Sequence, residues 1–381
     1  MKKIFSVILL SFTTLAAQNS YMDSLITAGI HQIYSIQFED AENTFAIVRQ
    51  KFPEHPAGKF FDAMIVWWRV LLDLKSETFD DLLRDKLDNV IDMCDDILDR
   101  NPDNVDAMFF KGGALGYRGR LSTLRYNWFD AAADGKDALP LVFKAYELDS
   151  TNVDVILGFG IYNYFAEKIP EAFPFVKPLM VFFPKGDKKK GLEQLEYVSK
   201  HGKYAKYEAL YFLMSSYYSF ENNPWKALEY AKTLNNEFPD NPRFEGYRGR
   251  INVKLNNYDE AFKIFSDIIN KYNLGYTGYT KRVKREAEYY VGVYYWNNDS
   301  LDLAENHFNN CVALSQEVDK DEESGFWVNA LLYLGKINDT KGEHEKAINY
   351  YEEVLDINEY KGSYDKAEQY IEKPYKRQKK R

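Results

Sequence analysis

The feature that most constrains this chain is a glycine that is followed by an alanine twelve residues later and by an aromatic ring four residues after that. Small residues allow two helices to approach closely where they cross, and a ring fills the space beside them. One such helix pair cannot bury its own apolar face, whereas stacked pairs can. The sequence therefore predicts an all-α fold, an α–α superhelix of about eight helix–turn–helix units between residues 22 and 361. The spacing occurs as Gly29-Ala41-Phe45, Gly249-Ala261-Phe265, Gly292-Ala304-Phe308 and Gly335-Ala347-Tyr351.

The length of the repeating unit and its stop signals point to a known family. Ala227 and Ala261 stand 34 residues apart, and Pro53 and Pro239 follow two of the second helices, which a proline cannot continue. The unit resembles the tetratricopeptide repeat, a helix–turn–helix with a small residue on helix A, an alanine and an aromatic residue on helix B, and a closing proline. The resemblance implies a superhelix whose inner face, lined by helices A, binds other proteins.

The pattern divides the chain into four segments. They are a signal peptide at 1–17, degenerate helical repeats at 18–205 with an apolar insertion at 170–186, regular repeats at 206–361, and a helix end with a basic tail at 362–381. Residues 182–221 are also similar to tetratricopeptide proteins related to eukaryotic inclusion-body clearance factors. That second resemblance implies the same architecture and no particular role.

The first residues are typical of an exported bacterial protein. Lys2 and Lys3 precede an apolar run from Ile4 to Leu15, and Ala16-Ala17-Gln18 offers a small-residue cleavage point. This run is too short for a membrane-spanning helix, and its flanks favour a signal peptide over a buried first helix. We expect cleavage near Ala17 and a periplasmic or secreted protein. No later run of 18 apolar residues predicts a transmembrane segment.

The charge of the chain argues against nucleic acid as a partner. Without Lys2, Lys3 and the six basic residues between Lys373 and Arg381, the remaining chain has 41 basic and 58 acidic residues, a formal charge of −17. Proteins that bind nucleic acid carry a basic face, so this acidic body predicts other partners. The basic tail is interpreted either as a solvated end or as a tether to an anionic envelope surface.

Motifs that would indicate chemistry fail in detail. Gly186 and Gly191 have the spacing of a phosphate-binding loop, but Leu192 and Glu193 stand where lysine and serine or threonine should follow. No two of the five histidines have metal-ligand spacing. We therefore predict no catalytic, cofactor-binding or metal-binding residue and a protein that is not an enzyme. Cys94 and Cys311 lie on apolar helix faces far apart in the chain, which favours two separate buried thiols.

Fixed positions of helix A line the inner face of tetratricopeptide proteins, and transferring them predicts a basic and aromatic strip. Such a strip suits an extended peptide or a chain terminus, held by charge-assisted hydrogen bonds and ring contacts. We therefore predict a non-catalytic scaffold that mediates protein–protein interaction in the cell envelope. The alternative is a glycan-binding module, suggested by the 30 Tyr and 26 Phe residues. The predicted strip comprises Phe212, Arg243, Arg250, Lys254, Tyr289, Trp296, Asn329 and Lys336.

Three other features leave alternatives open. The apolar insertion from Phe173 to Pro184 is either a plug on neighbouring helices or an exposed contact patch. The cations between residues 276 and 285 either are compensated by nearby acids or meet an anionic partner. The pentapeptide Gly-Tyr-Arg-Gly-Arg occurs at 116–120 and at 246–250; with Gly112 taken as the small position of its helix, the two copies are predicted to face differently.

Overall fold

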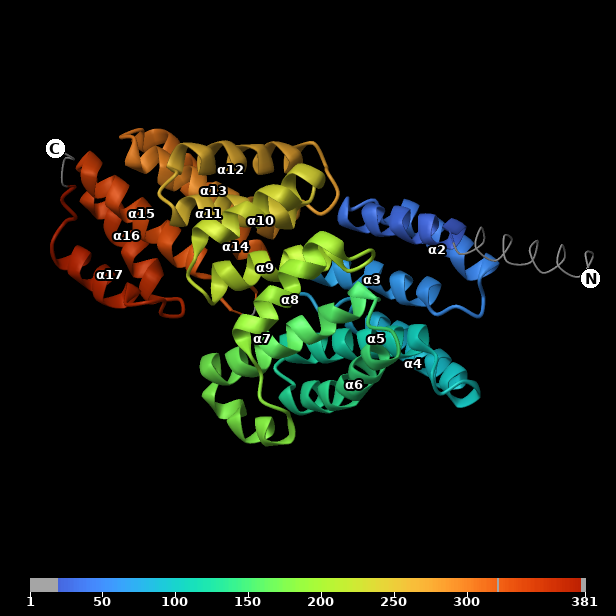
Figure 1. The fold of residues 1–381 in the computed structure, drawn as a ribbon. Helices are drawn as coiled ribbons and strands as arrows, with labels where there is room; N and C mark the ends of the chain where they lie inside the picture. Colours follow the sequence, from blue (N-terminus) through green and yellow to red (C-terminus); the bar gives the residue numbers. More distant parts are fainter. Residues whose placement is uncertain (1–19, 321, 378–381) are drawn as a thin grey trace, which may run out of the picture. The chain divides into compact units, whose positions relative to one another are not determined.

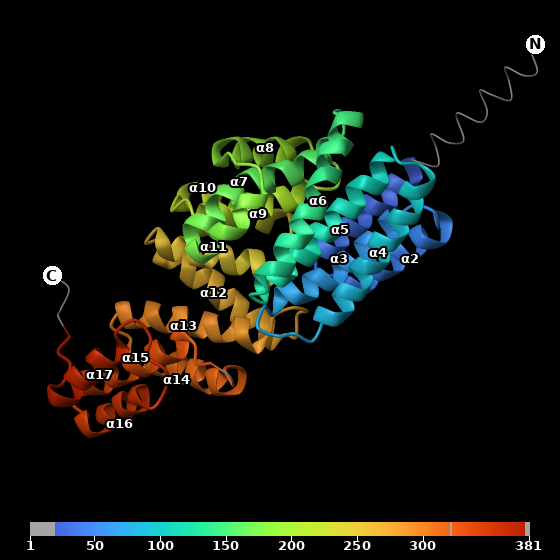
Figure 2. The ribbon, with the colours of Figure 1, turned by 90° about the horizontal axis from the view of Figure 1, so that it is seen from below.

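The computed structural model describes residues 20–377 apart from residue 321 (Figures 1 and 2). The chain divides into two compact units, Met1–Asn241 and Pro242–Arg381. Every regular element in the described residues is helical. The predicted signal peptide and the last four residues of the basic tail lie outside the described residues. The predicted segment boundaries stay a prediction.

The first unit begins with a helix over residues 20–34 and continues through nine further α-helices and two short 3₁₀ helices. Consecutive helices pack against one another along the chain. The elements are α2 (Phe38–Lys51), α3 (Ala57–Leu72), α4 (Asp80–Arg100), α5 (Val105–Leu124), α6 (Trp128–Leu148), η1 (Val153–Val155), α7 (Ile156–Ala172), η2 (Pro174–Phe182), α8 (Lys188–His201), α9 (Lys206–Ser219) and α10 (Pro224–Glu237).

The second unit contains three helix pairs and a final single helix. Consecutive helices again pack together, and α15 also contacts α13 and α17, the helices two places away. Together the two units hold eight helix pairs in the described residues, so the predicted all-α superhelix is confirmed. The helices are α11 (Pro242–Lys254), α12 (Tyr258–Asn273), α13 (Lys281–Asn297), α14 (Leu301–Val318), α15 (Gly325–Lys341), α16 (His344–Leu355) and α17 (Ser363–Glu372).

The glycine and the ring of each regular repeat meet where the two helices cross. A Cβ atom added at Gly335 would lie 2.3 Å from the Tyr351 ring, and one at Gly249 would lie 2.6 Å from Phe265. The same approach recurs at Gly29 and Phe45. Real Cβ atoms do not approach other atoms so closely. The two helices can therefore cross at this separation only because the residue at the crossing is glycine.

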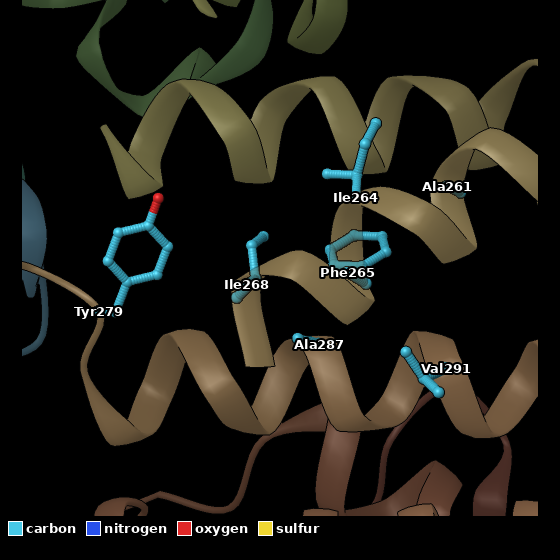
Figure 3. Close-up of a cluster of buried hydrophobic side chains, with 7 residues drawn as sticks. All are labelled: Ala261, Ile264, Phe265, Ile268, Tyr279, Ala287 and Val291. Atoms are coloured by element: carbon cyan, nitrogen blue, oxygen red, sulfur yellow. The ribbon is translucent and has the colours of Figure 1, made fainter. Parts of the chain in front are cut away.

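The same rings lie in the hydrophobic core between successive helix pairs. Figure 3 shows Phe265 of α12 beside Ile264 and Ile268, facing Ala287 and Val291 of α13. All five side chains are almost completely buried. Because α13 belongs to the next pair, this cluster buries the face that a single pair would leave exposed.

Local signals set the ends of several helices. The Asn223 side chain accepts a hydrogen bond from the Lys226 N–H at 3.1 Å, and Pro224 occupies the first position of α10, where its missing N–H costs nothing. Thr280 and Ser324 cap α13 and α15 in the same way. Gly342 ends α15 in the left-handed conformation, with φ of 83°.

The prediction that the two pentapeptides face differently is wrong. A Cβ at Gly119 would lie 3.2 Å from Asp134 and 3.3 Å from the Ala131 carbonyl of α6, so Gly119 faces its partner helix as Gly249 does. Gly112 faces α6 as well, two turns away. Gly112 and Gly119 both lie on the face of α5 that packs against α6, so the sequence alone does not show which of them corresponds to Gly249.

The side chains of the pentapeptides also correspond. The first arginine of each copy pairs with an acid on the partner helix B, and the second lies against the tyrosine of its own copy. The pairs are Arg118 with Asp134, Arg248 with Glu260, Arg120 with Tyr117 at 5.6 Å and Arg250 with Tyr247 at 4.7 Å.

The first helix pair of the first unit contacts the last one. The hydroxyl of Tyr34 donates to Glu208 of α9 at 2.9 Å, and the Asn241 amide donates to the Tyr34 carbonyl at 2.8 Å. Glu208 also accepts from Arg120 of α5 at 2.6 Å. The Arg120 guanidinium lies 4.8 Å from the Trp67 ring centroid, so this unit holds an ion pair between a half-buried arginine and a buried glutamate beside an aromatic ring.

The apolar insertion is partly packed and partly exposed. Val176 of η2 is buried, and Phe173 and Phe175 contact the Trp128 ring of α6 at 5.2 and 5.5 Å. Phe175 and Val181 are nevertheless 63% and 82% exposed. The insertion therefore combines features of the two alternatives.

The crossing geometry makes a prediction for two glycines on one helix. We expect Gly249→Val to lower the free energy of unfolding of the full chain by about 1–3 kcal/mol, because its side chain would overlap the buried Phe265 ring. Gly246→Val is the matched control, since a Cβ there meets only the Arg250 guanidinium at 3.6 Å or more. Urea denaturation followed by circular dichroism measures both. Equal stabilities of the two variants would contradict the packing described here.

Candidate functional site

The second unit presents a face that is lined by α13, α15 and α17. Tyr333, Lys336 and Asp339 follow one another at intervals of three on α15, so they lie along one side of that helix. Trp296 of α13 lies 5.6 Å from Tyr333, ring centroid to ring centroid. Tyr370 of α17 completes the lining on the other side of Lys336. We call these five residues the α15 face.

Lys336 lies among three tyrosine rings. Its Nζ is 5.2 Å from the Tyr333 centroid and 5.5 Å from the centroids of both Tyr370 and Tyr375, distances at which a ring attracts a cation. Among the residues that the structure describes, no carboxylate forms an ion pair with Lys336. Burial, and then the charge of Lys366, lower the pKa of Lys336 to about 8.

A short segment after α17 lies on the α15 face. Lys373 is extended, with φ of −141° and ψ of 113°, and the Tyr375 N–H donates to the Asp339 Oδ2 at 2.7 Å. The Tyr375 ring lies 6.1 Å from Trp296 and 5.4 Å from Tyr370. We call residues 373–377 the docked segment.

The docked segment ends in a second set of contacts around Trp296. The Arg377 guanidinium lies 4.2 Å from the Trp296 ring centroid and pairs with Asp299 at 2.7 Å. Its Nη2 also donates to the Trp296 carbonyl. Arg377 therefore combines a cation–π contact, an ion pair and a main-chain hydrogen bond, a set that a planar guanidinium makes well.

Asp339 is held in place by the packing of its own repeat. Its side chain is fully buried and accepts from the Tyr351 hydroxyl at 2.8 Å and from His344 Nδ1 at 2.6 Å. Tyr351 is the ring that fills the crossing at Gly335. Burial and Asp339 raise the pKa of Tyr351 well above its ordinary value, so its hydroxyl remains a donor. The packing of the repeat thus orients the carboxylate that holds the docked segment.

The structure brings three of the eight predicted strip residues together. Tyr289, Trp296 and Lys336 all contact the Tyr333 ring, at 6.3, 5.6 and 5.2 Å. Of these, Trp296 is almost completely buried, at 8% exposure, in part because the docked segment covers it.

The other five strip residues lie elsewhere. Arg243 and Arg250 both lie against Tyr247 of α11, Arg250 pairs with Glu286 at 2.9 Å, and Lys254 is exposed at the end of the same helix. The Asn329 amide donates to the Gly325 carbonyl within α15. Phe212 belongs to the first unit, where it is buried against Arg120.

Sequence reasoning missed Tyr333, Asp339, Tyr370, Tyr375 and Arg377. The spacing of Tyr333 and Asp339 from Lys336 could have found two of them, because residues three apart share a helix face. Tyr370 lies beyond the last regular repeat, where no repeat position could be transferred. Nothing in the local sequence indicates that Tyr375 and Arg377 return to α13.

Three of the four cations near the start of α13 are compensated by acids, as in the first of the two alternatives, whereas Lys284 donates to Asn273 and lies over the Tyr272 ring. Arg282 and Arg285 pair with Asp319 at 3.1 and 2.6 Å, and Lys281 pairs with Glu317. Asp319 is buried and also accepts from the Ser324 N–H. These cations therefore join α13 to the end of α14 and the start of α15.

A cleft of about 450 Å³ in the first unit is a weaker candidate. Its carboxylates already serve the fold: Asp154 accepts three backbone N–H groups at residues 203–205, and Asp23 pairs with Lys203. Asp149 accepts from Thr151, and Asp106 lies 3.6 Å from His55. The polar lining is thus explained by internal contacts.

The described residues contain neither a metal-binding cluster nor a membrane-spanning helix. No group of three or more His, Cys, Asp or Glu side chains there is arranged to hold a metal ion. None of the helices in this part of the chain combines the length and apolar character needed to cross a bilayer. Cys94 and Cys311 are both buried and free, as predicted.

One of the regular repeats matches a known family. The family model described as tetratricopeptide repeat matches residues 328–361, which include Gly335, Ala347 and Tyr351. The same glycine–ring crossing recurs at Gly249, Gly292 and Gly29. Residues 328–361 form a tetratricopeptide repeat. The resemblance found in the sequence is confirmed, and Lys336 and Asp339 stand on helix A of the matched repeat.

Several solved structures are similar to this chain at low identity. Yeast Tom70 is similar over 96% of this chain and 84% of its own, with 13% identity and a TM-score of 0.39. The C-terminal part of a TPR repeat-containing protein from Cytophaga hutchinsonii is similar over 82% and 98%, with 17% identity and a TM-score of 0.36. Human IFIT1 covers 84% of this chain and 68% of its own, at 13% identity and 0.39. No curated protein matches the chain in sequence.

The environment of Lys336 predicts a measurable titration. With lysines ¹³C-dimethylated and followed by NMR, we expect one resonance to titrate near pH 8, because burial disfavours the charged amine. The variant Lys336→Met should lack that resonance. If the missing resonance titrates together with the bulk of the lysines, Lys336 is solvated, and its burial among the three tyrosine rings is contradicted.

The same shift has a consequence for stability. The pKa of Lys336 is lower in the folded chain than its ordinary value of 10.5, so the folded chain binds this proton less well. The charge opposes folding below about pH 8, and this cost is relieved as the pH rises from about 8 toward 10.5. Comparing Lys336→Met with the parent chain over this interval isolates the contribution.

Proposed function

We propose that this tetratricopeptide protein is a non-catalytic scaffold of the bacterial cell envelope that binds extended peptide segments of partner proteins. The binding surface is the α15 face of the second unit. The observation that carries the proposal is the docked segment, which leaves α17 through an extended Lys373 and lies on this face. It is held by a main-chain hydrogen bond to Asp339 and by ring and guanidinium contacts to Trp296.

These contacts are of the kind that bind peptides in general. A carboxylate that accepts a backbone N–H recognises any extended main chain, and ring recesses add selectivity for individual side chains. Helices A from neighbouring repeats supply the lining, so the surface extends from α13 across α15 to α17. A stack of helix pairs can therefore bind a peptide on this surface without a conformational change.

The absence of a catalytic role is supported by the state of the two thiols. Burial raises the pKa of Cys94 and of Cys311 to about 12, which keeps both protonated and poorly nucleophilic. Both side chains pack within helix interfaces. They contribute to the core rather than to a reactive site.

The envelope location comes from the sequence alone. It rests on the basic start, the apolar run and the Ala16-Ala17-Gln18 site. Mass spectrometry of the protein purified from its own cells tests this: a mature N-terminus at Gln18 is expected, and an intact Met1 start would contradict export.

The glycan-binding alternative draws no support from the aromatic side chains. In the described residues many rings contact other rings, and those of the α15 face surround a cation or the docked segment. The most exposed rings, at Tyr126, Phe129 and Trp225, do not line the cleft of the first unit. Proteins remain the class of partner that the fold favours.

The proposal predicts that a change of the face abolishes partner capture. We expect the combined variant Trp296→Leu, Lys336→Met to recover at least about tenfold less cross-linked partner from native envelope than the parent bait, since two residues of the α15 face are replaced. Lys263→Ala with Lys346→Ala is the matched control, because both lysines are exposed on helices B. Recovery of the same proteins in equal amount by the face variant would refute the assignment of the surface.

A further inference from the structure

The docked segment identifies the chemistry that the α15 face accepts. We infer that this face recognises an aromatic–x–arginine segment, and that the chain's own Tyr375-Lys376-Arg377 occupies it until a partner segment of the same pattern replaces it. The inference rests on the proposed function and adds to it the chemical class of the partner and an intramolecular competitor.

The aromatic position is defined by what surrounds the Tyr375 ring. Trp296, Tyr370 and the Lys336 amine approach it from three elements, at 6.1, 5.4 and 5.5 Å. An aliphatic side chain would fill part of this recess but could not attract the Lys336 cation through a ring face. Any aromatic side chain suits the recess, whereas a small or aliphatic one leaves Lys336 without its third ring.

The arginine position is defined by three different partners. Trp296 offers its ring face at 4.2 Å, Asp299 a carboxylate at 2.7 Å, and the end of α13 the Trp296 carbonyl. The carbonyls of a final helical turn have no partner within the helix and attract cations. A lysine cannot stack flat on the ring while it also donates in two directions, so arginine is preferred.

The interval of two residues follows from the backbone. The Tyr375 N–H is fixed on Asp339 Oδ2, which sets the register of the segment on α15. Tyr375 and Arg377 both contact Trp296, while Lys376 between them is exposed. The middle position is therefore unspecified.

The intramolecular occupant is suited to replacement. Only Lys373 and Pro374 separate Tyr375 from the end of α17, so the segment competes at the high effective concentration of a short tether. Its side-chain contacts are made by Tyr375 and Arg377. The ion pair of Arg377 is with the Asp299 carboxylate, which is 85% exposed and therefore holds the segment weakly. A partner that adds contacts elsewhere on helices A can displace it, and weaker sequences are kept out.

The first experiment compares three full chains. They are the parent, a released variant with Tyr375→Ala and Arg377→Ala, and the control Lys376→Ala. The probe is a fluorescein-labelled peptide with the sequence of residues 372–378, followed by fluorescence anisotropy. We expect the released variant to bind the probe at least about tenfold more tightly than the parent and the control, because its site is open.

Changes in the probe keep the test independent of how the variants fold. Against the released variant, replacing the probe's tyrosine or its arginine by alanine should weaken binding at least about tenfold, and replacing the middle lysine should have little effect. Equal binding to the parent and the released variant, or equal binding of all probes, would overturn the inference. So would a parent dimer in light scattering that the released variant lacks, since the occupant would then come from a second copy.

A selection separates this inference from the proposed function. Random peptides displayed on phage are panned on the released variant and eluted with the 372–378 peptide. Enrichment of aromatic–x–arginine sequences supports the inference. Enrichment of other sequences that the peptide still displaces overturns the inference and leaves the proposed function standing. If no peptide is enriched, both fail.

Discussion

The architecture depends on the contact between a glycine and a ring at the crossing of each helix pair. Where the Cβ is missing, as at Gly335, Tyr351 lies directly against the opposite backbone and fixes the separation of the helices. In the last pair this contact reaches further, since the Tyr351 hydroxyl also holds Asp339, and Asp339 holds the docked segment. A single packing constraint thus sets the spacing of the repeat and the position of the group that binds main chain.

The charge of the α15 face depends on which basic side chains of the second unit form ion pairs with acids and which do not. The cations at the start of α13 are taken up by Asp319, and Arg250 by Glu286, so they contribute to joining helices. Lys336 has tyrosine rings in place of an acid. Burying a cation without a carboxylate costs stability, and proteins tolerate that cost mainly at functional sites. On an acidic protein this cation distinguishes one surface from the rest.

The sequence was sufficient for what depends on neighbouring residues. Helix pairs and their crossing glycines follow from periodicity, which reports local geometry. The helix-A positions of Trp296 and Lys336 follow from the resemblance to the repeat family. It was insufficient where distant segments meet. The return of Tyr375 and Arg377 to α13 spans about eighty residues and leaves no periodic trace. The pentapeptide at 116–120 was misjudged because Gly112 and Gly119 lie on the same helix face, and only the position of α6 shows that both pack against it.

The contact of the first helix pair with the last one sets the first unit apart from an ordinary array. In a linear array each repeat touches only its neighbours, and order can be lost one repeat at a time from either end. Tyr34 and Glu208 are 174 residues apart, and Tyr34 and Asn241 are 207 apart. Such contacts form only after a long loop has closed, which makes folding slower and leaves few stable partial states. We therefore expect the helix pairs of the first unit to unfold together, in one cooperative step, and not one after another from an end.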